Sequence, residues 1–193
     1  MELSVQSPFL ETERLLIRPF TWDDWDLVLA FASDPGTTRY LYSWAHPGVT
    51  PEMDARRFLG SAVEAWREDP VTYREYVLIL KETGEAIGEG SIELVAPDTS
   101  ELGWILLPQA RGRGYIHEMA LRLIRFGLET LHTPHIIAHC DARNTPSWHV
   151  MGKLGMKLEQ LAPGARPLKD GIRGDEMTWG MRFDLPDCDK SMP

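Results

Sequence analysis

The residues with the clearest chemical potential form a glycine-rich turn between an expected strand and an expected helix. The turn has the sequence Gln-Ala-Arg-Gly-Arg-Gly over residues 109–114. Gly112 and Gly114 allow the backbone to adopt positive φ and to approach a ligand closely. The unpaired N–H groups and the dipole at a helix start attract anions, and Arg111 and Arg113 add donors suited to phosphate. The segment predicts either an anion-binding loop or a tight connection with solvated arginines.

Two familiar phosphate-binding loops do not fit this turn. A dinucleotide-binding fingerprint requires a third glycine at its sixth position, which His117 occupies in this chain. A Walker loop ends in Gly-Lys-Ser or Gly-Lys-Thr, and the turn has no such ending. Neither of these nucleotide-binding classes is therefore expected.

A second group of reactive side chains follows the expected helix. His132, His135, His139 and Cys140 all carry atoms that can ligate a metal. His135 and His139 fall in one expected strand, where their side chains share a face but lie two pleats apart. No set of spacings typical of a tetrahedral site is present. We therefore expect no metal.

The elements that would position these residues follow from hydrophobic periodicity and turn residues. Strands are expected at 13–18, 76–95 (a hairpin turning at 82–85), 101–107, 135–140, 156–161 and 176–183. Helices are expected after Thr21 and at 53–66, 115–131 and 144–154, with a loop or broken helix over 34–50. Within the long helix, Glu118–Arg122 and Arg125–Glu129 are expected to form i,i+4 pairs. This order predicts one α/β (α+β) domain built on a mixed sheet.

Composition limits the class of protein. The chain has 193 residues, of which 43% are hydrophobic and 25% charged, as in an ordinary globular protein. Two cysteines, Cys140 and Cys188, are too few for a disulfide scaffold and fit a reducing compartment. The first residues do not resemble a signal peptide, and no apolar run reaches transmembrane length. We expect a single cytoplasmic domain over residues 1–193, with no membrane partner.

The charge of the chain is unevenly distributed. A net charge of −9 argues against a nucleic-acid partner. Residues 1–100 hold 8 basic and 18 acidic side chains, whereas residues 101–160 hold 7 basic and 5 acidic ones. This division suits a protein that meets a cation with its first half and an anion with its central segment. Chance clustering on solvated faces would also produce it.

The glycine-rich turn resembles the acetyl-coenzyme A loop of the GNAT superfamily of N-acetyltransferases. That signature is Gln/Arg-x-x-Gly-x-Gly/Ala between a strand and a helix, and residues 109–114 match it. Residues 112–118 resemble the Gly-x-Gly-Tyr-Ala-x-Glu run of the branch that acetylates ribosomal-protein amino termini. Three further segments resemble that branch in the same order: Glu-Thr-Glu-Arg-Leu-Leu-Ile-Arg from residue 11, Asn-Thr-Pro-Ser with Lys-Leu-Gly-Met from residues 144 and 153, and Asp-Glu-Met-Thr-Trp from residue 175.

The resemblance covers about residues 11–183 and implies a fold. In that GNAT fold a mixed, mostly antiparallel twisted sheet of about seven strands is flanked by helices and splays open at the strand that binds the coenzyme. The turn here lacks the aromatic residue that this branch often places before the first glycine, since Arg111 occupies that position. The adenosine end of the coenzyme is therefore expected to be held differently.

The resemblance also implies acetyl-CoA as cosubstrate. The backbone at the end of the strand would pair with the pantetheine arm, and one N–H there would polarise the thioester carbonyl. The implied coenzyme-binding residues are Ile105, Leu106, Leu107, Gln109, Arg111, Gly112, Arg113, Gly114, Tyr115, Ile116, Asn144 and Ser147. Because Asn-x-Pro-Ser is also an ordinary helix start, Ser147 is either the acid that protonates the leaving thiolate or a structural cap.

Catalytic and acceptor-binding residues follow from the same resemblance. Glu101 matches the carboxylate that this branch often uses as general base, with Glu89 and Glu93 as competitors. Any of the three could also be a solvated strand residue. The acceptor pocket is expected to include aromatic side chains of the broken segment, namely Tyr40, Tyr42 and Trp44.

The expected function is acetyl-CoA-dependent N-acetyl transfer to a primary amine by direct attack in a ternary complex. The acceptor is either a protein amino terminus or a small-molecule amine, and the sequence does not distinguish between them. A non-catalytic module that binds coenzyme A is the alternative, because fold does not fix function. Dimers are common among similar proteins, so a homodimer is a further expectation.

Overall fold

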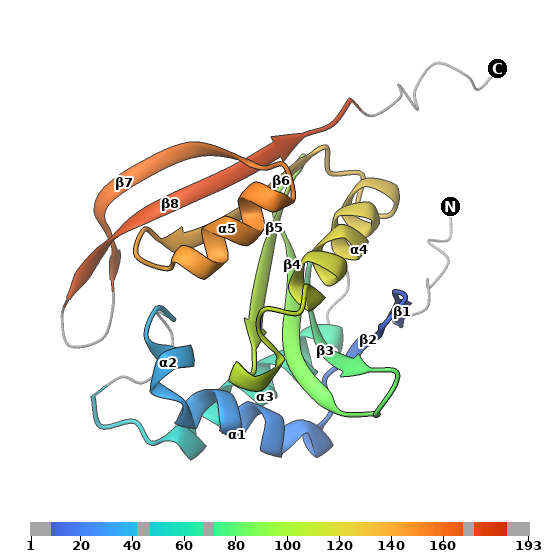
Figure 1. The fold of residues 1–193 in the computed structure, drawn as a ribbon, viewed down its shortest axis with the longest axis vertical. Coiled ribbons are helices and arrows are strands. Elements are labelled where there is room, and N and C mark those ends of the chain that lie inside the picture. The colour runs from blue at the N-terminus through green and yellow to red at the C-terminus, as the bar shows by residue number, and fades with distance from the viewer. Residues whose placement is uncertain (1–8, 42–46, 68–71, 168–171, 185–193) are drawn as a thin grey trace.

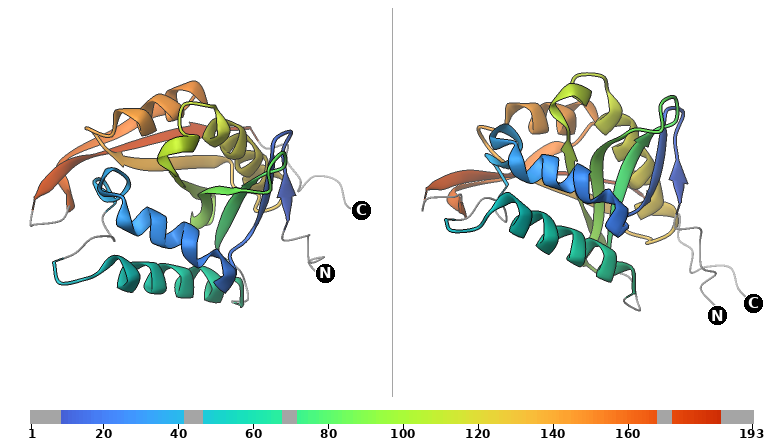
Figure 2. Two further views of the ribbon diagram at one scale, coloured as in Figure 1. Left: turned by 60° about the horizontal axis from the view of Figure 1, so that its bottom comes forward. Right: turned by 90° about the horizontal axis from the view of Figure 1, so that it is seen from below.

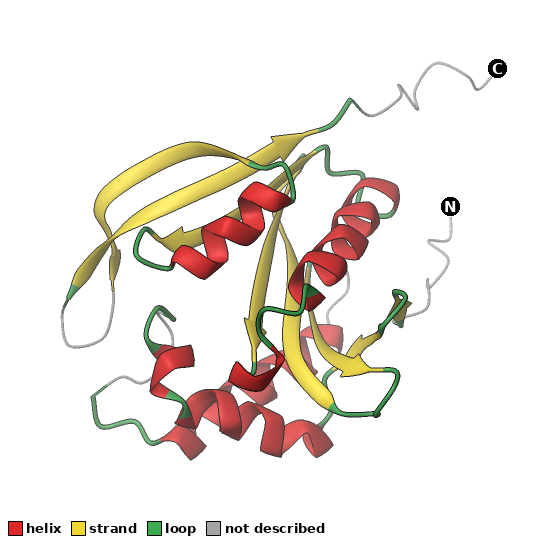
Figure 3. Cartoon of the chain, in the orientation of Figure 1, coloured by secondary structure: helices red, strands yellow, loops and turns green. Residues whose placement is uncertain are grey.

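The computed structural model of the chain describes residues 9–41, 47–67, 72–167 and 172–184. Its centre is one eight-stranded sheet with helices on both faces (Figures 1 and 3). The strands are β1 (Leu10–Glu11), β2 (Leu15–Pro19), β3 (Tyr73–Leu80), β4 (Ala86–Ala96), β5 (Thr99–Leu106), β6 (His135–Asp141), β7 (Lys157–Pro167) and β8 (Arg173–Arg182). The helices are α1 (Trp25–Ser33), α2 (Pro35–Thr38), α3 (Pro51–Glu64), α4 (Tyr115–Glu129) and α5 (Thr145–Lys153).

The strand order is β1-β2-β3-β4-β5-β6-β8-β7. Neighbouring strands run antiparallel, apart from β5 and β6, which are parallel. The expected mixed, mostly antiparallel sheet is therefore confirmed. The central hairpin, the helix after the glycine-rich turn and the strand–helix pair that follows it all lie where periodicity predicts them.

The parallel pairing of β5 with β6 is very short. It comprises three residue pairs and ends at Glu101 and Ile137. Beyond this point β5 continues to pair with β4 up to Leu106, and β6 continues to pair with β8 up to Asp141. The two strands therefore separate, and the sheet opens along one edge of β5.

Helices cover both faces of the sheet (Figure 2), and each face buries its own hydrophobic core. The amphipathic helix α4 packs residues such as Met119 and Leu123 against Tyr76, Ile92 and Ile136 of the sheet. Helices α1 and α3 pack on the opposite face in a second core. Its main members are Phe20, Val28, Phe31, Leu59, Val77, Ile105 and Leu107. Alternation along β5 decides which core each side chain enters, because successive strand residues point to opposite faces.

Three details differ from expectation. Leu10–Glu11 adds a short edge strand, which makes eight strands instead of about seven. Strands β7 and β8 extend into the Gly/Pro-rich segment that was expected to be a loop, because a register shift between Ala162 and Arg166 accommodates it. Glu118 forms its ion pair with Arg14 near β2, in contrast to the expected partner Arg122 one turn along the helix.

None of the helices in the described residues is long and apolar enough to cross a bilayer.

The packing of α4 gives a stability prediction. Met119 is 0% exposed, so Met119→Ala should lower the free energy of unfolding by about 2–5 kcal/mol through lost burial and a residual cavity. Leu121 on the same helix is 49% exposed, and Leu121→Ala should change the free energy of unfolding by no more than about 0.5 kcal/mol. Urea denaturation of both variants checks this, and similar losses for the two would contradict the assigned faces of α4.

Candidate active site

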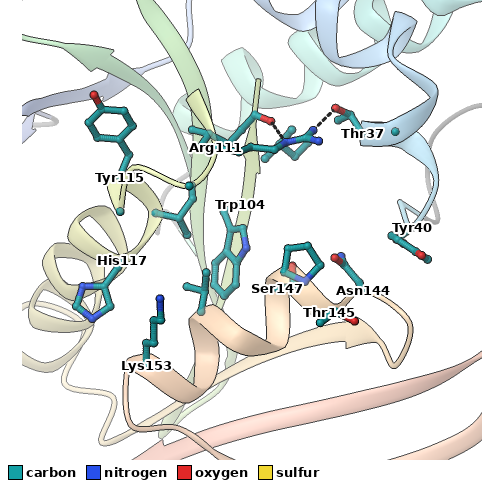
Figure 4. A pocket seen from close by; sticks show the side chains of 18 of the residues that line it. Thr37, Tyr40, Trp104, Arg111, Tyr115, His117, Asn144, Thr145, Ser147 and Lys153 are labelled. Carbon is teal, nitrogen blue, oxygen red and sulfur yellow. Dashed lines mark hydrogen bonds between the residues drawn. The ribbon is translucent and has the colours of Figure 1, made fainter. Parts of the chain in front are cut away.

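The opening beside β5 forms a cleft with a volume of about 570 Å³. Its walls come from the end of β5, the glycine-rich turn, the start of α4, the start of α5 and the segment around α2 (Figure 4). These elements are far apart in the sequence, and the splayed strands bring them together. The cleft is large enough for a cofactor-sized ligand.

The glycine-rich turn takes the conformation that its composition predicts. Gly112 and Gly114 have φ of 75° and 82°, in the left-handed region that other residues rarely adopt. Gly114 is the N-cap of α4, and Tyr115 and Ile116 begin the helix at the edge of the cleft. The first N–H groups of α4 therefore lie beside the cleft, where they can bind an anion.

Contacts with the amino-terminal segment hold the turn in place. The Arg14 guanidinium donates to the Glu118 carboxylate, 2.6 Å away, and to the Arg113 carbonyl oxygen, 3.1 Å away. The hydroxyl of Thr12 also donates to Glu118. Burial acts to raise the pKa of Glu118, but these hydrogen bonds outweigh it and hold the pKa below its ordinary value. A charged Glu118 thus anchors the first turn of α4.

Arg111 fastens the other side of the turn. Its Nε donates to the Leu106 carbonyl oxygen at 3.0 Å and its Nη2 donates to the Thr37 hydroxyl at 2.7 Å, as dashed lines show in Figure 4. A looser ion pair joins it to Asp34 at 3.7 Å. The guanidinium lines the cleft, but its hydrogen bonds tie the turn to α2 and so serve more than anion binding.

The start of α5 forms the facing wall. Asn144 is the N-cap of this helix, yet its side chain makes no capping hydrogen bond. Ser147 is the third residue of the helix, so the cap position belongs to Asn144. Both side chains line the cleft, as Figure 4 shows. The Asn-Thr-Pro-Ser pattern is thus a helix start that also places two polar side chains beside the cleft.

The expected residues of β5 and of the turn divide into two groups. Ile105 and Leu106 line the cleft. Leu107 does not, because its side chain enters the core under α1 and α3 and its N–H donates to the Ile87 carbonyl oxygen at 3.0 Å. Gln109 and Arg113 are exposed and lie outside the cleft wall. Tyr40 lines the cleft, whereas Tyr42 and Trp44 lie outside the described residues.

Sequence reasoning missed several cleft residues. Those that carry polar or aromatic groups are Thr37, Trp104, His117, Arg143, Thr145 and Lys153. Lys153 adds a positive charge on the facing helix α5, and His117 adds ring nitrogens in the first turn of α4. A signal existed for Lys153, since it belongs to the Lys-Leu-Gly-Met segment and closes a helix that starts at Asn144. Arg143 is less available for contact with a ligand, because its guanidinium forms an ion pair with the buried Asp141 at 2.8 Å.

Glu101 lies where β5 and β6 still pair. Its carboxylate is 2.9 Å from Nδ1 of His139. This hydrogen bond raises the pKa of His139 above its ordinary value, although burial acts in the opposite direction. Glu101 and the exposed Glu93 line neither this cleft nor the adjoining cavity that contains Glu89.

Glu89 has a different environment from Glu101. It lines a second cavity of about 310 Å³ between α3 and the sheet, together with Glu75. Leu41, Trp104 and Ile105 line both cavities, so the two adjoin at β5.

The two carboxyl groups of this second cavity are nearly inaccessible, with exposed fractions of 4% for Glu75 and 3% for Glu89. Burial raises the pKa of Glu75 to about 7, against the effect of a hydrogen bond from Tyr73. Burial and the nearby charge of Glu75 raise the pKa of Glu89 well above its ordinary value. A carboxyl group with a pKa near neutrality suits proton transfer better than one with an ordinary pKa.

The histidines have other partners. Nε2 of His135 lies 3.0 Å from both carboxylate oxygens of Glu159, and its Nδ1 lies 3.2 Å from the Thr99 hydroxyl. Within the part of the chain that the structure describes, no group of three or more His, Cys, Asp or Glu side chains could hold a metal ion.

Comparisons with known proteins agree with this geometry. The family model described as "Acetyltransferase (GNAT) domain" matches residues 14–157. The N-acetyltransferase YnaD of Bacillus subtilis (strain 168) is 30% identical over 151 residues, which cover 78% of this chain and 83% of that relative.

Solved structures show the same fold. An acetyltransferase of the GNAT family from Bacillus anthracis has a TM-score of 0.76 at 27% identity, with 90% of this chain and 98% of that chain covered. The ribosomal-protein-S5-alanine acetyltransferase from Vibrio fischeri has a TM-score of 0.74 at 19% identity, with 91% and 97% covered. The family match and the identity to YnaD decide the assignment: the chain belongs to the GNAT family of acetyltransferases and is an acyltransferase enzyme.

Proposed function

We propose that this enzyme transfers the acetyl group of acetyl-CoA to a primary amine by direct attack in a ternary complex. One observation carries this proposal: the cleft opened by the short β5–β6 pairing adjoins a second, carboxyl-lined cavity at Ile105. A coenzyme and an acceptor can thus be held on either side of the same strand. Holding two reactants in this way supplies much of the rate acceleration of a bimolecular reaction.

The coenzyme would lie along the open edge of β5. Its phosphates would meet the N–H groups of the turn and the start of α4, beside His117 of that helix and opposite Lys153 of α5. Its pantetheine arm would run between β5 and α5, past Asn144. The backbone N–H of Leu106, whose carbonyl oxygen is bound by Arg111 on the open edge of β5, would then polarise the thioester carbonyl and stabilise the oxyanion.

The reaction needs one proton acceptor and one proton donor. An ammonium gives a proton to a carboxylate, and the nitrogen lone pair then attacks the thioester carbonyl carbon. The C–S bond breaks, and the departing thiolate takes up the second proton that the nitrogen loses. Ser147 in the cleft is placed to relay this proton. Position favours Glu89 as the proton acceptor, since it lines the adjoining cavity; Glu101, acting through water, is the alternative.

A non-catalytic role is a weaker candidate. It would leave the carboxyl-lined cavity beside β5 without a purpose, although such a module would still bind the coenzyme. Release of coenzyme thiol from acetyl-CoA by the purified protein in the presence of a panel of primary amines separates the two roles.

Coenzyme binding gives one prediction. Lys153→Ala should raise the Kd for coenzyme A by about three- to tenfold at low salt, and by less at high salt, because it removes a positive charge near the phosphates. Lys157→Ala is the matched control, since Lys157 is an exposed lysine outside the cleft. Calorimetric titration measures both, and equal losses of affinity would contradict the placement of the phosphates.

The identity of the base gives a second prediction. Glu89→Gln should lower kcat by on the order of 100-fold, as expected for loss of a general base, and should leave the Kd for acetyl-CoA nearly unchanged. Glu101→Gln should lower kcat by less than about fivefold. Steady-state kinetics of thiol release distinguishes the two, and the reverse order would assign the base to Glu101.

The raised pKa values predict the pH dependence. The carboxyl group must be ionised to accept a proton, so a pKa above the ordinary value moves the active range to higher pH. The pKa of the free enzyme governs kcat/KM for the amine, which should therefore rise with pH over a range above that of an ordinary glutamate. This rise should be lost in Glu89→Gln and retained in Glu101→Gln, whereas a profile already flat from about pH 5 would exclude a base of raised pKa.

A further inference from the structure

The cavity between α3 and the sheet has its own boundaries and its own chemistry. Helix α3 contributes Arg57, Phe58 and Ser61, and the sheet contributes Tyr73, Glu75, Glu89 and Gly103. Gly103 helps to create the space, because a Cβ there would lie 2.5 Å from the Ser91 hydroxyl oxygen. The cavity adjoins the coenzyme cleft through Leu41, Trp104 and Ile105.

The two carboxyl groups of this cavity are close neighbours on one face of the sheet. Glu75 lies opposite Ser91 and Glu89 opposite Val77 in the β3–β4 register, which makes the two glutamates diagonal neighbours. The Tyr73 hydroxyl donates to Glu75 at 2.6 Å, and the Ser91 hydroxyl and the Ile105 N–H act on Glu89. In the described part of the chain, the ion pairs include neither carboxyl group.

Arg57 is the cationic residue that lines this cavity, and it is already engaged. Its guanidinium pairs with the buried Asp54 at 2.7 Å on the same helix. Burying two adjacent carboxyl groups without a cation is costly, because each ionised form loses its hydration and repels the other. A positively charged ligand between them would remove this cost.

The size and walls of the cavity limit that ligand. A volume of about 310 Å³ is at the lower end of the range for small-molecule pockets. Phe58, Leu41 and Trp104 offer apolar and aromatic surface for a short carbon skeleton. A carboxylate next to the ligand's nitrogen would be brought close to two acidic groups, which costs affinity.

We infer that this cavity is the acceptor pocket and that the acceptor is a small primary amine without a carboxylate near its nitrogen, bound as a cation between Glu75 and Glu89. The inference rests on the proposed acetyl transfer and adds the substrate class. Glu75 is a specificity-determining residue in this arrangement, while Ile105 brings the bound amine next to the thioester.

The first test compares matched acceptors. Phenethylamine and phenylalanine share a ring and a primary amine, but phenylalanine adds a carboxylate beside the nitrogen. The wild-type enzyme should show kcat/KM at least about tenfold higher for phenethylamine. Equal or better use of phenylalanine would overturn the inference, as would a peptide amino terminus that is acetylated better than every small amine tested.

The second test changes the pocket in two independent ways. Glu75→Gln removes one acidic group, and Ser61→Phe fills the cavity from an exposed position while both carboxyl groups stay in place. Each should raise the KM for phenethylamine by about tenfold and leave the KM for acetyl-CoA unchanged. Glu85→Gln and Met53→Phe are matched controls at exposed positions outside the cavities.

A binding measurement keeps this inference separate from the proposed function. Phenethylamine should raise the Tm of the wild-type protein and of both controls, and should not raise it in Glu75→Gln or Ser61→Phe. If the wild type binds the amine in this way but releases no thiol, acetyl transfer is wrong and the pocket stands. If it releases thiol while both pocket variants keep the wild-type KM and Tm shift, the pocket is wrong and acetyl transfer stands.

Discussion

Three residue pairs between β5 and β6 decide where the whole site lies. Each strand keeps a second partner beyond Glu101 and Ile137, so the gap between them is held open from both sides. The backbone polar groups on the open edge of β5 then need partners from elsewhere. Arg111 satisfies the carbonyl of Leu106, and the rest of the edge faces the cleft. A longer parallel ladder would pair this edge internally and remove the site.

The arginines around the glycine-rich turn act mainly on its shape. Arg14 binds Glu118 and the Arg113 carbonyl, and Arg111 binds the Leu106 carbonyl and Thr37. These contacts hold the turn in one conformation in the absence of a ligand. Less conformational entropy is therefore lost when a ligand binds. In the proposed complex, the backbone N–H groups of the turn and Lys153 across the cleft would recognise the anion. The uneven distribution of charge along the sequence therefore serves to hold the turn in place as much as to bind a ligand.

Local patterns in the sequence predicted the turn, its helix and its strand, because these features depend on contiguous residues. They did not predict that Leu107 enters the second core or that Glu118 pairs with Arg14, since those outcomes depend on segments distant in the sequence. Glu75 was missed for a related reason. It stands in a strongly apolar strand, where a lone glutamate indicates nothing until a second one, Glu89, is brought beside it. The extension of β7 and β8 through a Gly/Pro-rich segment likewise depends on pairing that only the folded sheet provides.

The separation of the two cavities by one strand ties substrate binding to proton removal. Trp104 and Ile105 point to opposite faces of the sheet, yet both line both cavities, so a ligand on either side reaches the same stretch of β5. The burial that raises the pKa of Glu89 makes its ionised form costly while the cavity is empty. An ammonium beside it stabilises that ionised form, and departure of the amide product removes the stabilising charge. The carboxyl group of Glu89 would therefore accept a proton only while a substrate occupies the pocket. Burial of this group is sufficient to produce the dependence, and no conformational change is needed.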